Sequence, residues 1–92
     1  MYILGDIGNS ETKIYLVNSN RKIIKSINIS TKKININILK KKIRKLTKDL
    51  KKINKILFCS VVPKTFSLIR KFFGKNTKIR CYEVKDLNLR SI

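Results

Sequence analysis

The stretch that decides the fold is YILGDIGNSETK at residues 2–13. Its apolar start predicts a short buried strand over Tyr2–Ile7, and the polar residues that follow combine a carboxylate, a glycine, hydroxyl groups and a lysine. Gly8 lets the backbone turn tightly and come close to a ligand. Asp6 offers the hard oxygen that suits Mg²⁺, and Lys13 adds a point charge for phosphate. The pattern predicts a loop that holds a nucleotide's phosphates and their metal ion.

The polar residues of this loop support two interpretations. Ser10 and Thr12 can donate hydroxyl hydrogen bonds to phosphate oxygens, and the N–H groups of the turn can point together at an anion. The same Gly8-Asn9-Ser10 is also ordinary turn chemistry between the two strands of a β-hairpin. The two interpretations are compatible, because a phosphate-binding loop can be the tip of a hairpin.

Length and composition describe one small domain with an unusual charge. The chain has 92 residues, and its 23 Lys and Arg against 5 Asp and Glu give a formal net charge of +18. Such a balance raises the question of nucleic acid or an anionic membrane. The cations are mostly lysines spread over the whole chain, which favours a general composition bias over a dedicated binding face. A small basic nucleic-acid-binding module stays the alternative, and it would need arginines or exposed aromatic rings on one face.

The sequence contains no recognisable targeting or membrane-spanning segment. Asp6 interrupts the first apolar run, and no apolar segment approaches the roughly 20 residues that cross a bilayer. We therefore expect a cytoplasmic protein with no membrane partner, in which Cys59 and Cys81 are reduced thiols embedded in strands. The chain has no His, which excludes Ser-His and Cys-His catalytic pairs and leaves no zinc pattern.

The spacing of apolar residues predicts the remaining elements. Strands over residues 12–17 and 22–29 continue from the first strand as an antiparallel meander. A nearly continuous apolar run over residues 55–62 predicts a central strand buried on both faces. Pro63 is well placed to begin a helix that ends with Gly74 as its C′ residue, and a last strand covers residues 77–84. The tail from residue 85 onward is left unassigned.

One long helix is predicted between the meander and the central strand. Its apolar residues recur every three or four positions, at Ile36, Leu39, Ile43, Leu46, Leu50 and Ile53. Lysines and arginine occupy the other faces, as in a basic amphipathic helix for a membrane or nucleic acid. We favour an ordinary surface helix with solvated lysines, because a single apolar stripe is typical of helices that pack on a core.

The resulting order, β-β-β-α-β-α-β, predicts an α/β fold with a mixed sheet. It matches the ribonuclease H-like half-domain of the actin, hexokinase and Hsp70 ATPase superfamily. In that plan the first hairpin carries an aspartate and a glycine at the phosphates. Asp6 and Gly8 stand at that place in this chain.

Two segments of the chain resemble the type III pantothenate kinases. Residues 2–13 are similar to the opening of that family, and Cys59-Ser60-Val61-Val62-Pro63 is similar to its Ser-Val-Val-Pro segment at the end of the fourth strand. Their order and separation also fit, with a meander and one helix between them. The resemblance covers the whole chain but only the N-terminal part of a typical member. It implies that residues 1–92 are the N-terminal half-domain of a longer, two-domain kinase.

The resemblance implies ATP-dependent phosphorylation of pantothenate, the first step of coenzyme A biosynthesis. The implied cofactors are ATP, Mg²⁺ and a monovalent cation (K⁺ or NH₄⁺), and the full-length protein is expected to be a homodimer. Another kinase or ATPase of the same superfamily stays an alternative. Asp6 would sit at the metal. The family's ATP-binding loop carries over onto Asp6, Gly8, Asn9, Ser10, Glu11, Thr12 and Lys13.

The chain departs from the family pattern at several places. Ser10 stands where the family usually has Thr, which keeps the hydroxyl. Gly5 replaces a branched apolar residue, and glycine weakens a strand by roughly 0.5–1 kcal/mol. Glu11 places negative charge beside the phosphates, which is unhelpful unless it points to solvent. The family's Gly-x-Asp-Arg segment, which supplies the catalytic base and substrate contacts, does not occur in these residues. We therefore assign no catalytic residue and expect the chain to be inactive alone.

Overall fold

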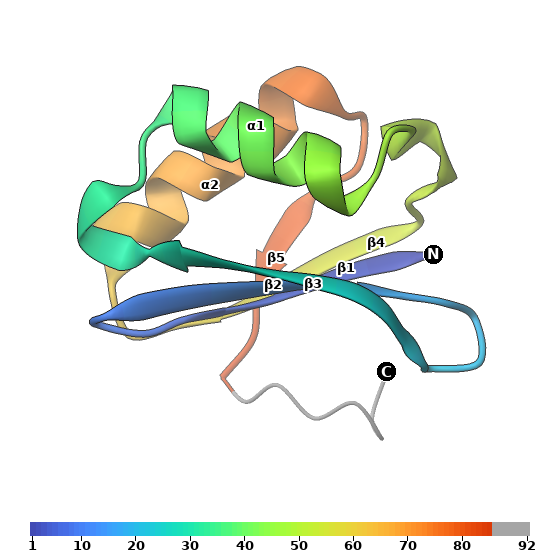
Figure 1. Ribbon diagram of the computed structural model, residues 1–92, viewed down its shortest axis with the longest axis horizontal. Helices are drawn as coiled ribbons and strands as arrows, with labels where there is room; N and C mark the ends of the chain where they lie inside the picture. Colours follow the sequence, from blue (N-terminus) through green and yellow to red (C-terminus); the bar gives the residue numbers. More distant parts are fainter. Residues whose placement is uncertain (86–92) are drawn as a thin grey trace.

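Five strands form one mixed sheet, and both helices lie on the same face of it (Figure 1). The computed structural model describes residues 1–85. The predicted element order and the mixed α/β sheet are confirmed, and they agree with a ribonuclease H-like half-domain. The elements are β1 (Tyr2–Ile7), β2 (Glu11–Val17), β3 (Ile23–Ser30), the 3₁₀ turn η1 (Thr31–Lys33), α1 (Ile36–Leu46), the 3₁₀ turn η2 (Leu50–Lys52), β4 (Lys55–Ser60), α2 (Pro63–Asn76) and β5 (Cys81–Glu83).

The strands are ordered β3-β2-β1-β4-β5, so β1 is the centre of the sheet. It pairs antiparallel with β2 and parallel with β4, and β4 pairs parallel with β5. Ile7 lies opposite Thr12 on one side and Ser60 on the other. The carboxyl ends of β1 and β4 therefore meet at the edge of the sheet that carries the turn between β1 and β2.

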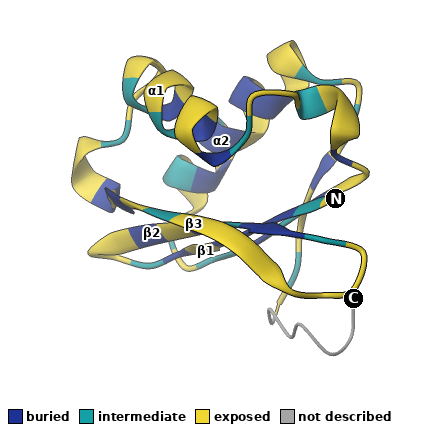
Figure 2. Cartoon of the chain, turned by 45° about the vertical axis from the view of Figure 1, so that its right-hand side comes forward, coloured by how far each residue is buried: buried dark blue, intermediate teal, exposed yellow. Residues whose placement is uncertain are grey.

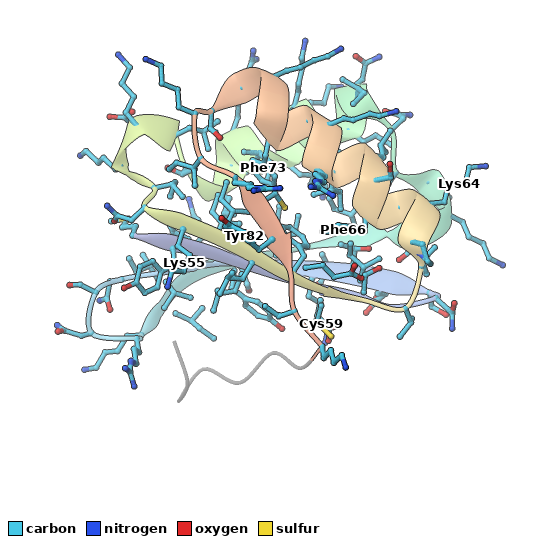
Figure 3. All side chains as sticks on the ribbon, turned by 180° about the vertical axis from the view of Figure 1, so that it is seen from behind. Lys55, Cys59, Lys64, Phe66, Phe73 and Tyr82 are labelled. Carbon is cyan, nitrogen blue, oxygen red and sulfur yellow. The ribbon has the colours of Figure 1, made fainter. Side chains whose placement is uncertain are left out.

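The core lies between the sheet and the helices, where the buried residues gather in Figure 2. Phe66 and Phe73 point from α2 toward the sheet (Figure 3). The ring of Phe73 lies 6.1 Å from that of Phe58 in β4, centroid to centroid. Within the described residues no helix covers the other face of the sheet, and Leu57 and Cys59 there are only half-buried, so β4 is not buried on both faces as predicted. It does lie inside the sheet, between β1 and β5.

Gly5 is required by packing although it is a poor strand residue by propensity. It pairs with Phe58 across β1 and β4, and a Cβ atom at residue 5 would overlap three atoms of the Phe58 ring. The ring is fully buried in the space that the glycine leaves open. A residue that weakens the strand locally thus allows the largest side chain of β4 to enter the core.

Helix α1 is the surface helix that we favoured, but it is shorter than predicted. Leu39, Ile43 and Leu46 are buried against the core, while most of its cations are exposed. The helix ends at Leu46 and not near Ile53. Beyond it, the hydroxyl of Thr47 accepts a hydrogen bond from the N–H of Asp49 (3.3 Å). The carboxylate of Asp49 in turn caps η2 by accepting from the N–H of Lys51. These local side-chain hydrogen bonds compete with those of a continuing helix. The helix therefore ends, although Leu50 and Ile53 continue its apolar spacing.

Helix α2 is longer than predicted, and β5 is shorter. Gly74 lies inside α2, which ends at Asn76 and is capped by Thr77, whose N–H and hydroxyl both donate to the carbonyl of Phe73 (2.8 and 2.9 Å). The φ angle of Gly74 is not positive, so it is not the C′ residue. The hydroxyl of Thr77 also accepts from the N–H of Ile79, which forms a turn where the strand was expected to begin. β5 covers only Cys81–Glu83.

Replacing Gly5 by alanine should lower the free energy of unfolding by about 1–3 kcal/mol, because the new Cβ overpacks the core against Phe58. Gly74→Ala is the matched control, because a Cβ there meets nothing within 4 Å. It should raise stability by about 0.5–1 kcal/mol, the usual cost of glycine inside a helix. Urea unfolding followed by circular dichroism measures both. Equal stability of the two variants would contradict the role given to Gly5.

Candidate functional site

The segment predicted to bind phosphates forms the tip of the hairpin between β1 and β2, which confirms the hairpin interpretation, while phosphate binding there stays a prediction. The N–H of Gly8 donates to the carbonyl of Glu11 (2.9 Å) and closes the turn. A Cβ atom on Gly8 would lie 3.1 Å from that same oxygen. No glycine in the described part of the chain has a positive φ. Gly8 therefore serves the close approach of two backbone segments and not a left-handed conformation.

Asn9 and Ser10 form the exposed end of the tip. Within residues 1–85, their N–H groups have no hydrogen-bond partner. Backbone N–H groups that are free at a turn can bind the oxygens of an anion. The structure thus leaves two adjacent donors open where the sequence predicted the phosphates.

Asp6 and Lys13 lie opposite each other on neighbouring strands, and both are exposed. Asp6 also lies opposite Cys59 of β4. The Cys59 side chain is on the face of the sheet away from the helices (Figure 3). Residues 1–85 contain no cluster of three metal-ligating side chains. A single exposed carboxylate fits Mg²⁺, which is usually held by one or two carboxylates together with phosphate oxygens and water.

Glu11 and Thr12 differ in how they relate to the loop. Glu11 is exposed, so water and salt screen its charge. Thr12 is fully buried and faces the helices together with Ile14. Its hydroxyl lies 2.9 Å from that of Thr31, so it supports the loop from inside. A direct bond from Thr12 to phosphate stays a prediction, and its burial in this structure does not favour it.

Thr31, which the sequence analysis did not single out, contacts the hairpin tip at three points. Its hydroxyl donates to the carbonyl of Gly8 (2.8 Å), and its N–H donates to the carbonyl of Ser10 (3.0 Å). The third contact is the hydroxyl pair with Thr12. Thr31 directly follows β3, and it reaches the tip only because β3 pairs in register with β2.

The second motif lies beside the first. The N–H of Val61 donates to the carbonyl of Ile7 (3.0 Å), and the hydroxyl of Ser60 accepts from the N–H of Val62 (3.0 Å). Helix α2 begins at the next residue, Pro63, without a side-chain cap. The N-terminal end of α2, whose dipole favours anions, therefore lies at the same edge of the sheet as the hairpin tip (Figure 1).

A cavity of about 510 Å³ adjoins this edge, lined by Ser60, Glu83, Val84 and Lys85. A larger hollow, of about 740 Å³, lies between β3 and the end of α1 and is lined by Lys25, Arg44, Lys45 and Lys48 among others. None of the residues predicted for the phosphates lines either cavity, but the smaller of these two includes Ser60 of the second motif. We therefore place the candidate site at the hairpin edge, where the two sequence motifs meet.

Comparison with known proteins shows the family of the chain. The sequence profile described as type III pantothenate kinase matches residues 2–91. The chain belongs to the type III pantothenate kinase family. A type III pantothenate kinase from Pelagibacter ubique (strain HTCC1062) is 54% identical over 92 residues, which are 100% of this chain and 37% of that protein. The resemblance seen in the two motifs is thereby confirmed, and the chain spans well under half the length of this relative.

Membership of the type III pantothenate kinase family also supports the actin-like ATPase interpretation of the fold. Within residues 1–85, no helix is both long and apolar enough to cross a membrane. Both thiols are free and lie in strands, as expected. Burial raises the pKa of the Cys81 thiol to about 12, and the charge of Arg70 opposes part of that rise.

The two cysteines of this pantothenate kinase family member should differ in reactivity. Cys81 is buried and held as a neutral thiol, whereas Cys59 is only half-buried. Iodoacetamide at pH 8 should modify Cys81 more slowly, by on the order of tenfold or more, because the thiolate is the nucleophile. The rate at Cys81 should still rise above pH 9, since its pKa lies near 12. Mass spectrometry of each peptide measures this, with guanidinium-unfolded chain as the control. Equal rates in the folded protein would contradict the burial of Cys81.

Proposed function

We propose that this chain supplies the phosphate-binding part of an ATP-dependent kinase that phosphorylates pantothenate. The observation that carries the proposal is the juxtaposition at one sheet edge of Asp6, the open N–H groups of Asn9 and Ser10, and the start of α2. Phosphoryl transfer depends mainly on positioning and on neutralising the phosphate charges. These groups offer both, without contributing a nucleophile or base of their own.

Each residue of the site has a distinct role in this proposal. Mg²⁺, when bound, neutralises charge on the phosphate oxygens, and Asp6 would be its protein ligand. The N–H groups of Asn9 and Ser10 would donate to phosphate oxygens, with the Ser10 hydroxyl beside them. Lys13, opposite Asp6 in the sheet, would add positive charge near the same oxygens.

Other parts of the proposal rest on the family resemblance. From the resemblance alone, we propose that the protein uses a monovalent cation (K⁺ or NH₄⁺), forms a homodimer and is located in the cytoplasm. The Gly-x-Asp-Arg segment that supplies the family's catalytic base is absent from residues 1–92. We therefore propose that these residues bind phosphate but do not complete the transfer alone, because the segment that would activate the acceptor hydroxyl is missing from them.

Asp6→Asn in the full-length protein should reduce kcat/KM for ATP at limiting Mg²⁺ by on the order of 100-fold, as expected when one electrostatic group at the transition state is removed. Asp49→Asn is the matched control. It makes the same change of a carboxylate at the start of η2, where asparagine caps equally well. A coupled assay with pantothenate and varied Mg²⁺ measures both. Wild-type turnover of the Asp6 variant at limiting Mg²⁺ would contradict the role of Asp6.

A further inference from the structure

We propose that Thr31 is a positioning residue that sets the geometry of the phosphate-binding loop, an inference that rests on the proposed function. Thr31 lies outside the loop and outside both motifs. It nevertheless holds two carbonyl groups of the tip, those of Gly8 and Ser10, at 2.8 and 3.0 Å. It is itself buried, with 8% of its surface exposed. It does not face the exposed end of the tip, so its effect on a ligand passes through the loop.

The direction of the hydrogen bonds follows from the proton count. Thr31 has one hydroxyl proton, and it goes to the carbonyl of Gly8. The Thr31 oxygen can then only accept from Thr12, so Thr12 donates. The result is a chain from Thr12 through Thr31 to Gly8, with its central part buried. Within the described residues, no buried side-chain nitrogen or oxygen lacks a partner, so this polar network is fully satisfied.

The planar trans peptide between Gly8 and Asn9 links these hydrogen bonds to the exposed side of the loop. The carbonyl of Gly8 and the N–H of Asn9 belong to one peptide unit, in which the two groups point in opposite directions. No peptide bond in the described residues is cis. Since Thr31 holds the Gly8 oxygen on the inner side, the Asn9 N–H is held outward, and it is one of the two open donors. Thr31 therefore fixes the direction of a proposed phosphate contact that it never touches.

The test compares Thr31→Val with Thr31→Ser in the full-length protein. Valine keeps the shape but removes the hydroxyl, so the Gly8–Asn9 peptide loses its internal partner. We expect the KM for Mg·ATP to rise by on the order of 10-fold or more, since small misplacements at a reacting site are costly. The KM for pantothenate should not change. Serine restores the hydroxyl and should return the KM for Mg·ATP to near the wild-type value.

Thr77→Val is the matched control for lost stability. The hydroxyl of Thr77 also makes partly buried hydrogen bonds, donating to the carbonyl of Phe73 (2.9 Å) and accepting from the N–H of Ile79 (3.1 Å), but it lies at the far end of α2. This variant should lose stability without a change in the KM for Mg·ATP. An unchanged KM in Thr31→Val, an equal rise in Thr31→Ser, or an equal rise in Thr77→Val would each overturn the positioning role.

A second readout separates this inference from the proposed function. Protection of residues 8–11 by Mg·ATP is measured by amide hydrogen exchange in the wild type and in Thr31→Val. If the wild type does not phosphorylate pantothenate, the proposed function fails. Mg·ATP protection that is present in the wild type and lost in the valine variant would still support the role of Thr31. No protection in the wild type, or equal protection in both, would overturn it.

Discussion

The ring of Phe58 occupies the space that a side chain at residue 5 would take, and the arrangement of the sheet follows from this contact. It sets β4 beside β1 in a parallel register in which Ile7 lies opposite Ser60. The same ring contacts Phe73, so α2 is held over these two strands. The helix must then begin at the carboxyl edge of the sheet, beside the hairpin tip. This contact thus lies at the centre of the packing that brings together two motifs about fifty residues apart along the chain.

Much of the fold could be predicted because apolar spacing reports which face of an element is buried. The order of elements followed from it, whereas the start of α2 at Pro63 followed from the preference of proline for the first turn of a helix. The errors arose where side chains bind nearby backbone groups. Thr47 and Asp49 end α1 early although Leu50 and Ile53 continue the apolar spacing, and Thr77 delays β5. Such hydrogen bonds compete with regular structure without altering the hydrophobic pattern.

The candidate site was predictable only in its local part. Residues 6–13 are contiguous, so their chemistry could be read from the sequence as the tip of a hairpin. The burial of Thr12 also had a signal, because Thr12, Ile14 and Leu16 alternate along one face of β2. No sequence signal pointed to Thr31, since its contact with Gly8 spans 23 residues and depends on the register of β2 with β3. Pairing between strands cannot be read from either strand alone.

We propose that the hairpin tip between β1 and β2 holds the phosphates of ATP. The most direct measurement is a crystal structure of the full-length protein with Mg²⁺ and a non-hydrolysable ATP analogue. We expect the triphosphate at residues 8–11, with the N–H of Asn9 donating to it and an Asp6 oxygen about 2.1 Å from the metal. A triphosphate bound away from this tip, or a metal bound at the phosphates without Asp6 in its coordination or hydration shell, would contradict it.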